Sequence, residues 1–152
     1  METPDPGTIA ASGPERERAL KCMPIVDYLV LGEQPYLEAH ECSSCGALYF
    51  DRRNACSRCF TTSFGARRLA TTGTVRAYTI VHRAAPSVPT PYTSVVIDLD
   101  EGGSVKANLL DVTEPAQLTA ASRVTLCTFS FGIDDDGVDA ISFGFRMEDT
   151  GE

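Results

Sequence analysis

Four cysteines in two closely spaced pairs are the residues of this chain best suited to chemistry. Cys42 and Cys45 form one CxxC motif, and Cys56 and Cys59 form a second, with ten residues between the motifs. Two such pairs at this spacing can bring four thiolates into one tetrahedron, as a structural Zn²⁺ ion requires. Because four sulfurs close the coordination shell, no position remains for water or substrate. The spacing therefore predicts a structural metal site.

Disulfide bonds and free thiols are the alternatives, and the pairing of two knuckles favours a metal over both. Thiolates alone do not distinguish zinc from the iron of a rubredoxin-like site. Gly46 follows the first pair, where a knuckle usually needs a residue without Cβ to leave the metal loop. Residues 47–50 predict a short strand and residues 51–54 a polar turn, which together are typical of a zinc ribbon.

Other segments must position this ribbon. Residues 1–13 form a polar tail, and Pro14 suits the first turn of a helix over residues 14–20. Residues 25–31 and 36–41 are expected to be extended on either side of a turn.

Beyond Arg67 the pattern changes to alternating, β-branched segments separated by turns. Five strands are expected, at 74–82, 92–99, 104–112, 123–131 and 138–146, with a proline-rich loop at 84–91, a short helical turn within 114–121 and a hairpin turn at 134–137. This succession suits a small Greek-key barrel of the OB type. Open sheets and sandwiches with similar strand numbers remain alternatives, because periodicity does not exclude them.

We therefore expect a mainly β chain in three parts. An N-terminal tail and helical or extended arm occupies residues 1–35, a rubredoxin-like zinc ribbon residues 36–66, and a five-stranded OB-fold barrel residues 67–148. Within the barrel, Val75, Ala77, Thr79 and Val81 should share one face, and so should Cys127, Phe129 and Phe131.

Composition is that of a globular protein, with 43% hydrophobic and 22% charged residues. No apolar run approaches the ~20 residues of a membrane span, and the N-terminus lacks a charged, hydrophobic signal. These features predict a soluble cytoplasmic protein with reduced cysteines.

Residues 41–68 carry five arginines against two acidic side chains, whereas residues 69–152 carry five basic side chains against twelve acidic ones. A basic ribbon on an acidic barrel indicates a local anion site; a solvated arginine-rich turn is the alternative.

A series of motifs from about Tyr36 to Met147 resembles a known family. They are the first knuckle, Tyr49–Arg53, Gly73–Val75, Thr79–Arg83 and Pro91–Tyr92. The series resembles the acyl-CoA-associated zinc-ribbon/OB-fold proteins, which are accessory subunits of thiolase-fold enzymes. The stretches Arg52–Cys56 and Phe143–Phe145 look closest to the small subunit of benzoylsuccinyl-CoA-thiolase-like complexes.

The resemblance implies a hetero-oligomer with a thiolase-fold protein, either a thiolase or acyltransferase or a lipid-transfer-protein-like aldolase. It also implies a structural Zn²⁺ and a CoA thioester as the shared ligand of the complex. Arginine side chains match phosphate geometry, and the proline-rich loop holds an exposed segment extended. The candidate CoA or partner contacts are accordingly Arg52, Arg53, Arg58, His82, Arg83 and Tyr92. His82 as a polar strand-end residue and Tyr92 as a core residue are the alternatives.

One position departs from the family pattern, which often places glycine after the second knuckle. Here Phe60 stands there, and an aromatic residue does not take a left-handed turn cheaply. The departure puts the geometry of the second knuckle in question, although not its ligation.

We find no catalytic motif in the sequence. Cys127 lacks a residue placed to activate it, and His40 is expected on the surface because four thiolates already close the metal shell. We therefore expect no catalysis by the isolated chain, with the thiolase chemistry on the partner.

A standalone acyl-CoA carrier remains an alternative function. A single-stranded nucleic-acid binder is disfavoured by the acidic barrel and an isoelectric point of about 4.7.

Overall fold

The computed structural model describes residues 8–9, 21–112, 116, 118–119 and 121–148. The helix expected over residues 14–20 lies outside these residues, as does half of the helical turn expected within 114–121. The regular elements of the described part are β1 (Thr8–Ile9), β2 (Lys21–Pro24), β3 (Leu29–Val30), β4 (Tyr36–Cys42), β5 (Leu48–Tyr49), β6 (Phe64–Arg68), β7 (Thr72–Val81), β8 (Tyr92–Leu99), β9 (Ser104–Leu109), β10 (Arg123–Ile133) and β11 (Val138–Met147).

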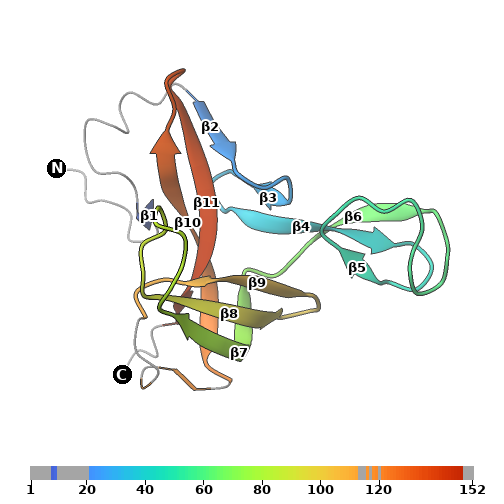
Figure 1. Cartoon of the computed structure of the whole chain (residues 1–152). Helices are drawn as coiled ribbons and strands as arrows, with labels where there is room; N and C mark the ends of the chain where they lie inside the picture. The colour runs from blue at the N-terminus through green and yellow to red at the C-terminus, as the bar shows by residue number, and fades with distance from the viewer. Residues whose placement is uncertain (1–7, 10–20, 113–115, 117, 120, 149–152) are drawn as a thin grey trace.

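Five strands close into a barrel in the order β7-β8-β9-β11-β10, with β10 returning to β7 (Figure 1). The pairings are antiparallel except that between β9 and β11, which is parallel. This is the five-stranded OB arrangement, so the predicted barrel is confirmed and the open sheet and the sandwich are excluded.

The barrel core follows strand alternation. The burial of β8 alternates along its whole length, and Val95 and Ile97 are fully buried. They pack in one cluster with residues from the other strands, and Phe145 of β11 is the largest fully buried side chain. Each such aliphatic or aromatic side chain contributes about 1.5–3 kcal/mol by leaving water.

Two β-bulges make the predicted face assignments wrong. In β7 the register shifts between Val75 and Ala77, so Arg76 is the extra residue and Ala77 is exposed. In β10 the register shifts between Ser130 and Gly132. Phe131 stands in this second bulge and is 73% exposed. A bulge places two residues opposite one, which inverts the faces beyond it, and plain alternation cannot show this.

The described part of the N-terminal arm contains short strands, and residues 25–28 between β2 and β3 form bends and a turn, with Leu29 N–H donating to the carbonyl of Val26. The prediction that residues 25–31 are extended is therefore wrong except at β3. β1 pairs in parallel with β10 and β2 in parallel with β11, so the two strands extend the barrel sheet at its two ends. β3 pairs with the start of β4, and the rest of β4 pairs with β5 and β6. These last three strands form the ribbon, which projects away from the barrel (Figure 1).

Aromatic contacts join the arm, the ribbon and the barrel. The ring of Tyr28 lies 4.5 Å from that of Phe50 in the ribbon and 5.9 Å from that of Phe143 in β11, measured between centroids. Burial, with a smaller contribution from the charge of Asp51, raises the pKa of Tyr28. Leu29 and Leu37 belong to the same hydrophobic core as the barrel residues. The base of the ribbon is therefore anchored in the barrel core.

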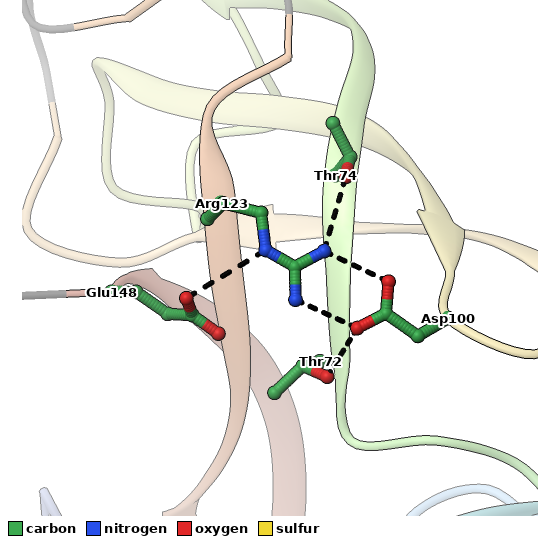
Figure 2. A network of polar contacts seen from close by, with 5 residues as sticks. All are labelled: Thr72, Thr74, Asp100, Arg123 and Glu148. Atoms are coloured by element: carbon green, nitrogen blue, oxygen red, sulfur yellow. Dashed lines mark hydrogen bonds and ion pairs between the residues drawn. The ribbon is translucent and has the colours of Figure 1, made fainter.

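A polar network holds the barrel closed where β10 meets β7 (Figure 2). Arg123 of β10 donates two hydrogen bonds, of 2.8 and 2.7 Å, to the carboxylate of Asp100. Thr72 of β7 donates a third hydrogen bond of 2.6 Å to the same carboxylate, and Glu148 lies 3.7 Å from Arg123. The Arg123 guanidinium and the Thr72 hydroxyl hold the pKa of Asp100 well below its usual range.

This network predicts an acid-dependent loss of stability. A carboxylate with a lowered folded-state pKa stabilises the fold above its unfolded pKa of about 3.9, and this contribution is lost as the pH falls below that value. We expect Asp100→Asn to lower the melting temperature by a few degrees at pH 7. The difference should shrink progressively below about pH 4 and vanish only once the pH falls below the lowered folded-state pKa. Thermal melts of both proteins across this range measure the difference. Asp135→Asn, in the exposed β10–β11 turn, is the control. A difference that is independent of pH would contradict the ion-pair explanation.

Candidate functional site

The structure brings the four knuckle cysteines together. Their sulfur atoms all lie within 4.8 Å of one another, with Cys42 Sγ 3.4 Å from Cys59 Sγ and Cys45 Sγ 3.6 Å from Cys56 Sγ. All four are free cysteines, and a disulfide would need about 2.05 Å. Four thiolates bonded to Zn²⁺ at about 2.3 Å in a tetrahedron stand roughly 3.8 Å apart. The cluster therefore has the size and the donor set for a tetrahedral metal ion.

Both knuckles use the same turn. Gly46 N–H donates to the carbonyl of Cys42 over 3.0 Å, and Phe60 N–H donates to the carbonyl of Cys56 over 2.8 Å. Both turn residues are left-handed, with φ of 76° for Gly46 and 65° for Phe60. The second knuckle thus keeps the geometry that the sequence put in question. The left-handed conformation costs Phe60 on the order of 1 kcal/mol relative to glycine.

Hydrogen bonds from the turns stabilise two of the thiolates. Backbone N–H groups of Cys45 and Ser44 lower the pKa of Cys42 to about 6. The Tyr49 hydroxyl, followed by backbone N–H groups, lowers the pKa of Cys56 to about 7. For Cys45 the backbone N–H of Ala47 acts in the same direction, but burial and the neighbouring sulfurs outweigh it and raise the pKa to about 11. Four thiolates this close need a cation between them.

Two side chains around the sulfur cluster were missed by the sequence analysis. The Tyr49 hydroxyl lies 3.4 Å from Cys56 Sγ and 2.8 Å from Ser57 Oγ. The Thr61 hydroxyl lies 2.6 Å from Cys59 Sγ. Such contacts orient metal ligands and tune their basicity. Thr61 stands two residues after Cys59, and that position was the only signal for it in the sequence.

The five ribbon arginines divide into two groups. Arg67 pairs with Glu41 over 2.6 Å and donates to the backbone oxygen of Glu101, while the guanidinium of Arg68 lies 4.3 Å from the ring centroid of Tyr36. The other three are exposed and have no carboxylate partner among the described residues: Arg52, Arg53 and Arg58. The ion pair thus removes Arg67 from the anion site expected from charge alone, whereas Arg68, like these three, is exposed without a carboxylate partner in the described structure.

Arg53 is held beside the second knuckle. Its guanidinium lies 4.7 Å from the ring centroid of Tyr49, whose hydroxyl contacts the knuckle residue Ser57. A cation over a tyrosine face is favourable by about 0.5–1 kcal/mol when exposed. Tyr49 therefore connects the metal cluster to the basic surface.

The remaining predicted contact residues lie on the barrel. His82 and Arg83 are exposed just after β7, and Tyr92 is half-buried at the start of β8, paired with Val81. Tyr92 and Tyr78 line an open groove of about 440 Å³ across β7, β8 and β9. The β7–β8 loop and the tip of the ribbon lie on opposite sides of the molecule (Figure 1). The candidate contacts thus form two separate groups.

A second cavity, of about 420 Å³, lies between the ribbon and the β8–β9 hairpin. Leu48 and Phe50 of the ribbon, Leu69 and the hairpin residue Gly103 line it, together with Arg67. None of the predicted contact residues borders it. Sequence patterns gave no signal for it, because it arises from the way the two units meet.

Among the residues that the structure describes, we find no further candidate for catalysis. Cys127 is buried, as predicted, and burial raises the pKa of its thiol, the opposite of an activated nucleophile. His40 is exposed on β4. Across the described residues, the knuckle cysteines form the one group of potential metal ligands. No helix in this part of the chain has the length and apolar character to cross a membrane.

Comparisons with known proteins match both units. Residues 31–65 match the family model of the ChsH2 rubredoxin-like zinc ribbon domain, and residues 66–128 match that of the ChsH2 C-terminal OB-fold domain. The chain is 30% identical to a DUF35 domain-containing scaffold protein of Methanocaldococcus jannaschii, over 70% of this chain and 77% of that protein. It is 29% identical to the benzoylsuccinyl-CoA thiolase subunit BbsA of Thauera aromatica, over 76% of this chain and 78% of that subunit.

Among solved structures, a chain of the Ltp2-ChsH2(DUF35) aldolase has the same fold. The TM-score is 0.57 at 23% identity, covering 74% of this chain and 84% of that one. The four positioned cysteines, the closed OB barrel and these matches lead to one conclusion: the chain belongs to the DUF35 family of ChsH2-type zinc-ribbon/OB-fold proteins.

Proposed function

We propose that this chain is a non-catalytic accessory subunit that docks onto a thiolase-fold enzyme and helps to position its acyl-CoA thioester. One observation carries the proposal: the chemistry-bearing cysteines form a cluster with four sulfur donors and no open position. Relatives named as thiolase subunits support it, as does the shared fold with an aldolase component. In this proposal the chain supplies surfaces that bind the partner and position the thioester, and the carbon–carbon bond chemistry takes place on the partner.

The metal in this proposal is zinc, held by Cys42, Cys45, Cys56 and Cys59. A four-thiolate Zn²⁺ ion supplies folding free energy and no catalytic position. The ribbon needs this contribution, because three short strands bury too little apolar surface to be stable alone. We further propose that the ribbon (36–66) and the barrel (67–148) are separate structural units, with residues 1–35 as an arm.

The arginines at the ribbon tip serve CoA or partner binding in this proposal. CoA carries a 3′-phosphate and a pyrophosphate, and a guanidinium offers them paired donors. Arg52, Arg53 and Arg58 are free for this role within the described structure. The β7–β8 loop lies on the other side of the molecule from the ribbon tip (Figure 1). We therefore assign its end residues His82, Arg83 and Tyr92 to a second contact with the complex.

We expect about one Zn²⁺ ion per chain by elemental analysis. Replacement of Cys56 by serine should abolish metal binding and expose the ribbon amides to rapid hydrogen exchange, because metal binding is the main folding energy of so small a unit. The barrel amides should remain protected. Cys22→Ser, at an exposed cysteine outside the cluster, is the matched control. A purified protein with neither zinc nor iron would contradict the metal site.

The function itself is tested by purifying the tagged full-length chain from its native cells. We expect a thiolase-fold protein to copurify and the complex to turn over CoA thioesters, while the isolated chain shows no turnover. The physical reason is the absence of a nucleophile–base pair and of an open metal position in the described structure. A monomer that binds acyl-CoA without a protein partner would indicate a carrier. Turnover by the isolated chain that is lost on mutation of Cys127 or His82 would overturn the proposal.

An inverted charge tests the basic surface. We expect Arg53→Glu to weaken assembly, or to raise the KM of the complex for CoA substrates, by about fivefold or more, since repulsion replaces attraction. Lys21→Glu, an equal inversion on the exposed strand β2, should have little effect. If Arg52, Arg53 and Arg58 can all be replaced by alanine with unchanged assembly and unchanged KM, the basic surface is only a solvated turn.

A further inference from the structure

Phe60 combines two unfavourable features that nothing in the described part of the chain offsets. Its backbone is left-handed, with φ of 65°, a conformation that glycine adopts freely and aromatic residues rarely do. Its side chain is 79% exposed, the most exposed large hydrophobic side chain in the described structure. Folding of this chain alone therefore gains little from the ring and would be easier with glycine at the same position.

The surroundings of Phe60 are rigid. Phe60 N–H donates to the carbonyl of Cys56, and Arg58 N–H donates to Cys56 Sγ over 3.4 Å, so both residues belong to one tight turn around the sulfur cluster. Cys59, directly before Phe60, is one of the four clustered cysteines. A side chain on such a turn loses little backbone entropy when it is buried by another molecule.

The same turn is basic. Arg58 lies two residues before Phe60, and the Tyr49 hydroxyl contacts Ser57 of the turn while the Tyr49 ring carries the guanidinium of Arg53. Both arginines are exposed. An exposed aromatic side chain beside exposed arginines has the composition of an interface hot spot, in which Tyr, Trp, Phe and Arg are enriched.

We propose that Phe60 is the anchor of the ribbon: it inserts into an apolar socket on the thiolase-fold partner, and acidic side chains around the socket face Arg53 and Arg58. The proposal rests on the proposed function and adds the residue and the chemistry of the contact. The charge around Phe60 argues for the acidic rim, because residues 43–66 carry three arginines, all exposed, against one acidic side chain, Asp51.

A second exposed phenylalanine provides the comparison. Phe131 is 73% exposed, but it stands in the β10 bulge close to the turn with Asp134, Asp135 and Asp136. Its surroundings are acidic and belong to the barrel, and the β10–β11 hairpin lies away from the ribbon tip (Figure 1). Phe131→Ala therefore removes a ring of equal size and similar exposure without touching the proposed surface.

The test uses the full-length chain and the thiolase-fold protein that copurifies with it, separated and titrated against each other. Phe60→Gly and Phe60→Ala should each weaken binding at least tenfold, whereas Phe131→Ala should change the Kd by less than twofold. Phe60→Gly should also keep its metal and melt at the same temperature as the parent chain or higher, since glycine relieves the left-handed backbone. Loss of binding in a more stable protein separates an anchoring role from a structural one.

Three results would count against the proposal in distinguishable ways. If no thiolase-fold protein copurifies, the proposed function fails and the anchor fails with it. If the partner copurifies and binds the Phe60 variants as tightly as the parent chain, the proposed function stands and the anchor is overturned. If the chain instead forms a dimer that Phe60→Gly dissociates, the socket belongs to a second copy of this chain, which also overturns the proposal.

Discussion

The convergence of four sulfur atoms is the constraint on which the ribbon depends. Three short strands cannot bury enough apolar surface to be stable alone, so the tip of the ribbon needs a cross-link of another kind. Cys42 and Cys59, seventeen residues apart, approach to 3.4 Å, and the two knuckle turns close around this point. Tyr49 and Thr61 then pack on the sulfurs, and Arg53 lies on Tyr49. The arrangement of the basic surface thus follows from the cluster beneath it.

The barrel depends on a different physical principle. Its hydrophobic core is assembled by alternation along β8 and the strands beside it, and the short β7–β10 pairing is reinforced by the ion pair of Arg123 with Asp100. The two units are joined by aromatic contacts around Tyr28 and by the hydrogen bonds of Arg67 to Glu41 and to the backbone of Glu101. The sulfur cluster, suited to a metal ion, therefore stabilises the ribbon tip, and hydrophobic burial stabilises the barrel. The two parts are joined in one continuous structure.

Features with local causes could be predicted from the sequence. The cysteine spacing predicted the cluster, and turn residues with β-branched segments predicted the five barrel strands. The bulges at Arg76 and Phe131 were not predictable, because a bulge is decided by the partner strand. Backbone propensity disfavours a left-handed conformation for an aromatic residue. Phe60 nevertheless adopts it, because the knuckle turn requires it. The contact of Tyr49 with Cys56 and the cavity beside Arg67 result from tertiary packing, for which a single sequence has no local signal.

Strand β4 contributes one face to the barrel core and the other to the sulfur cluster. In β4 the side chains of Leu37 and Ala39 are buried in the cluster shared with the barrel, while Cys42, of opposite parity, lies among the knuckle sulfurs. Insertion or deletion of a single residue between Ala39 and Cys42 would turn one of these sets outward. Across evolution this short segment should therefore vary by substitution and not by length. Exchange of ribbons between relatives should succeed only when the junction keeps Ala39 and Cys42 on opposite faces of the strand.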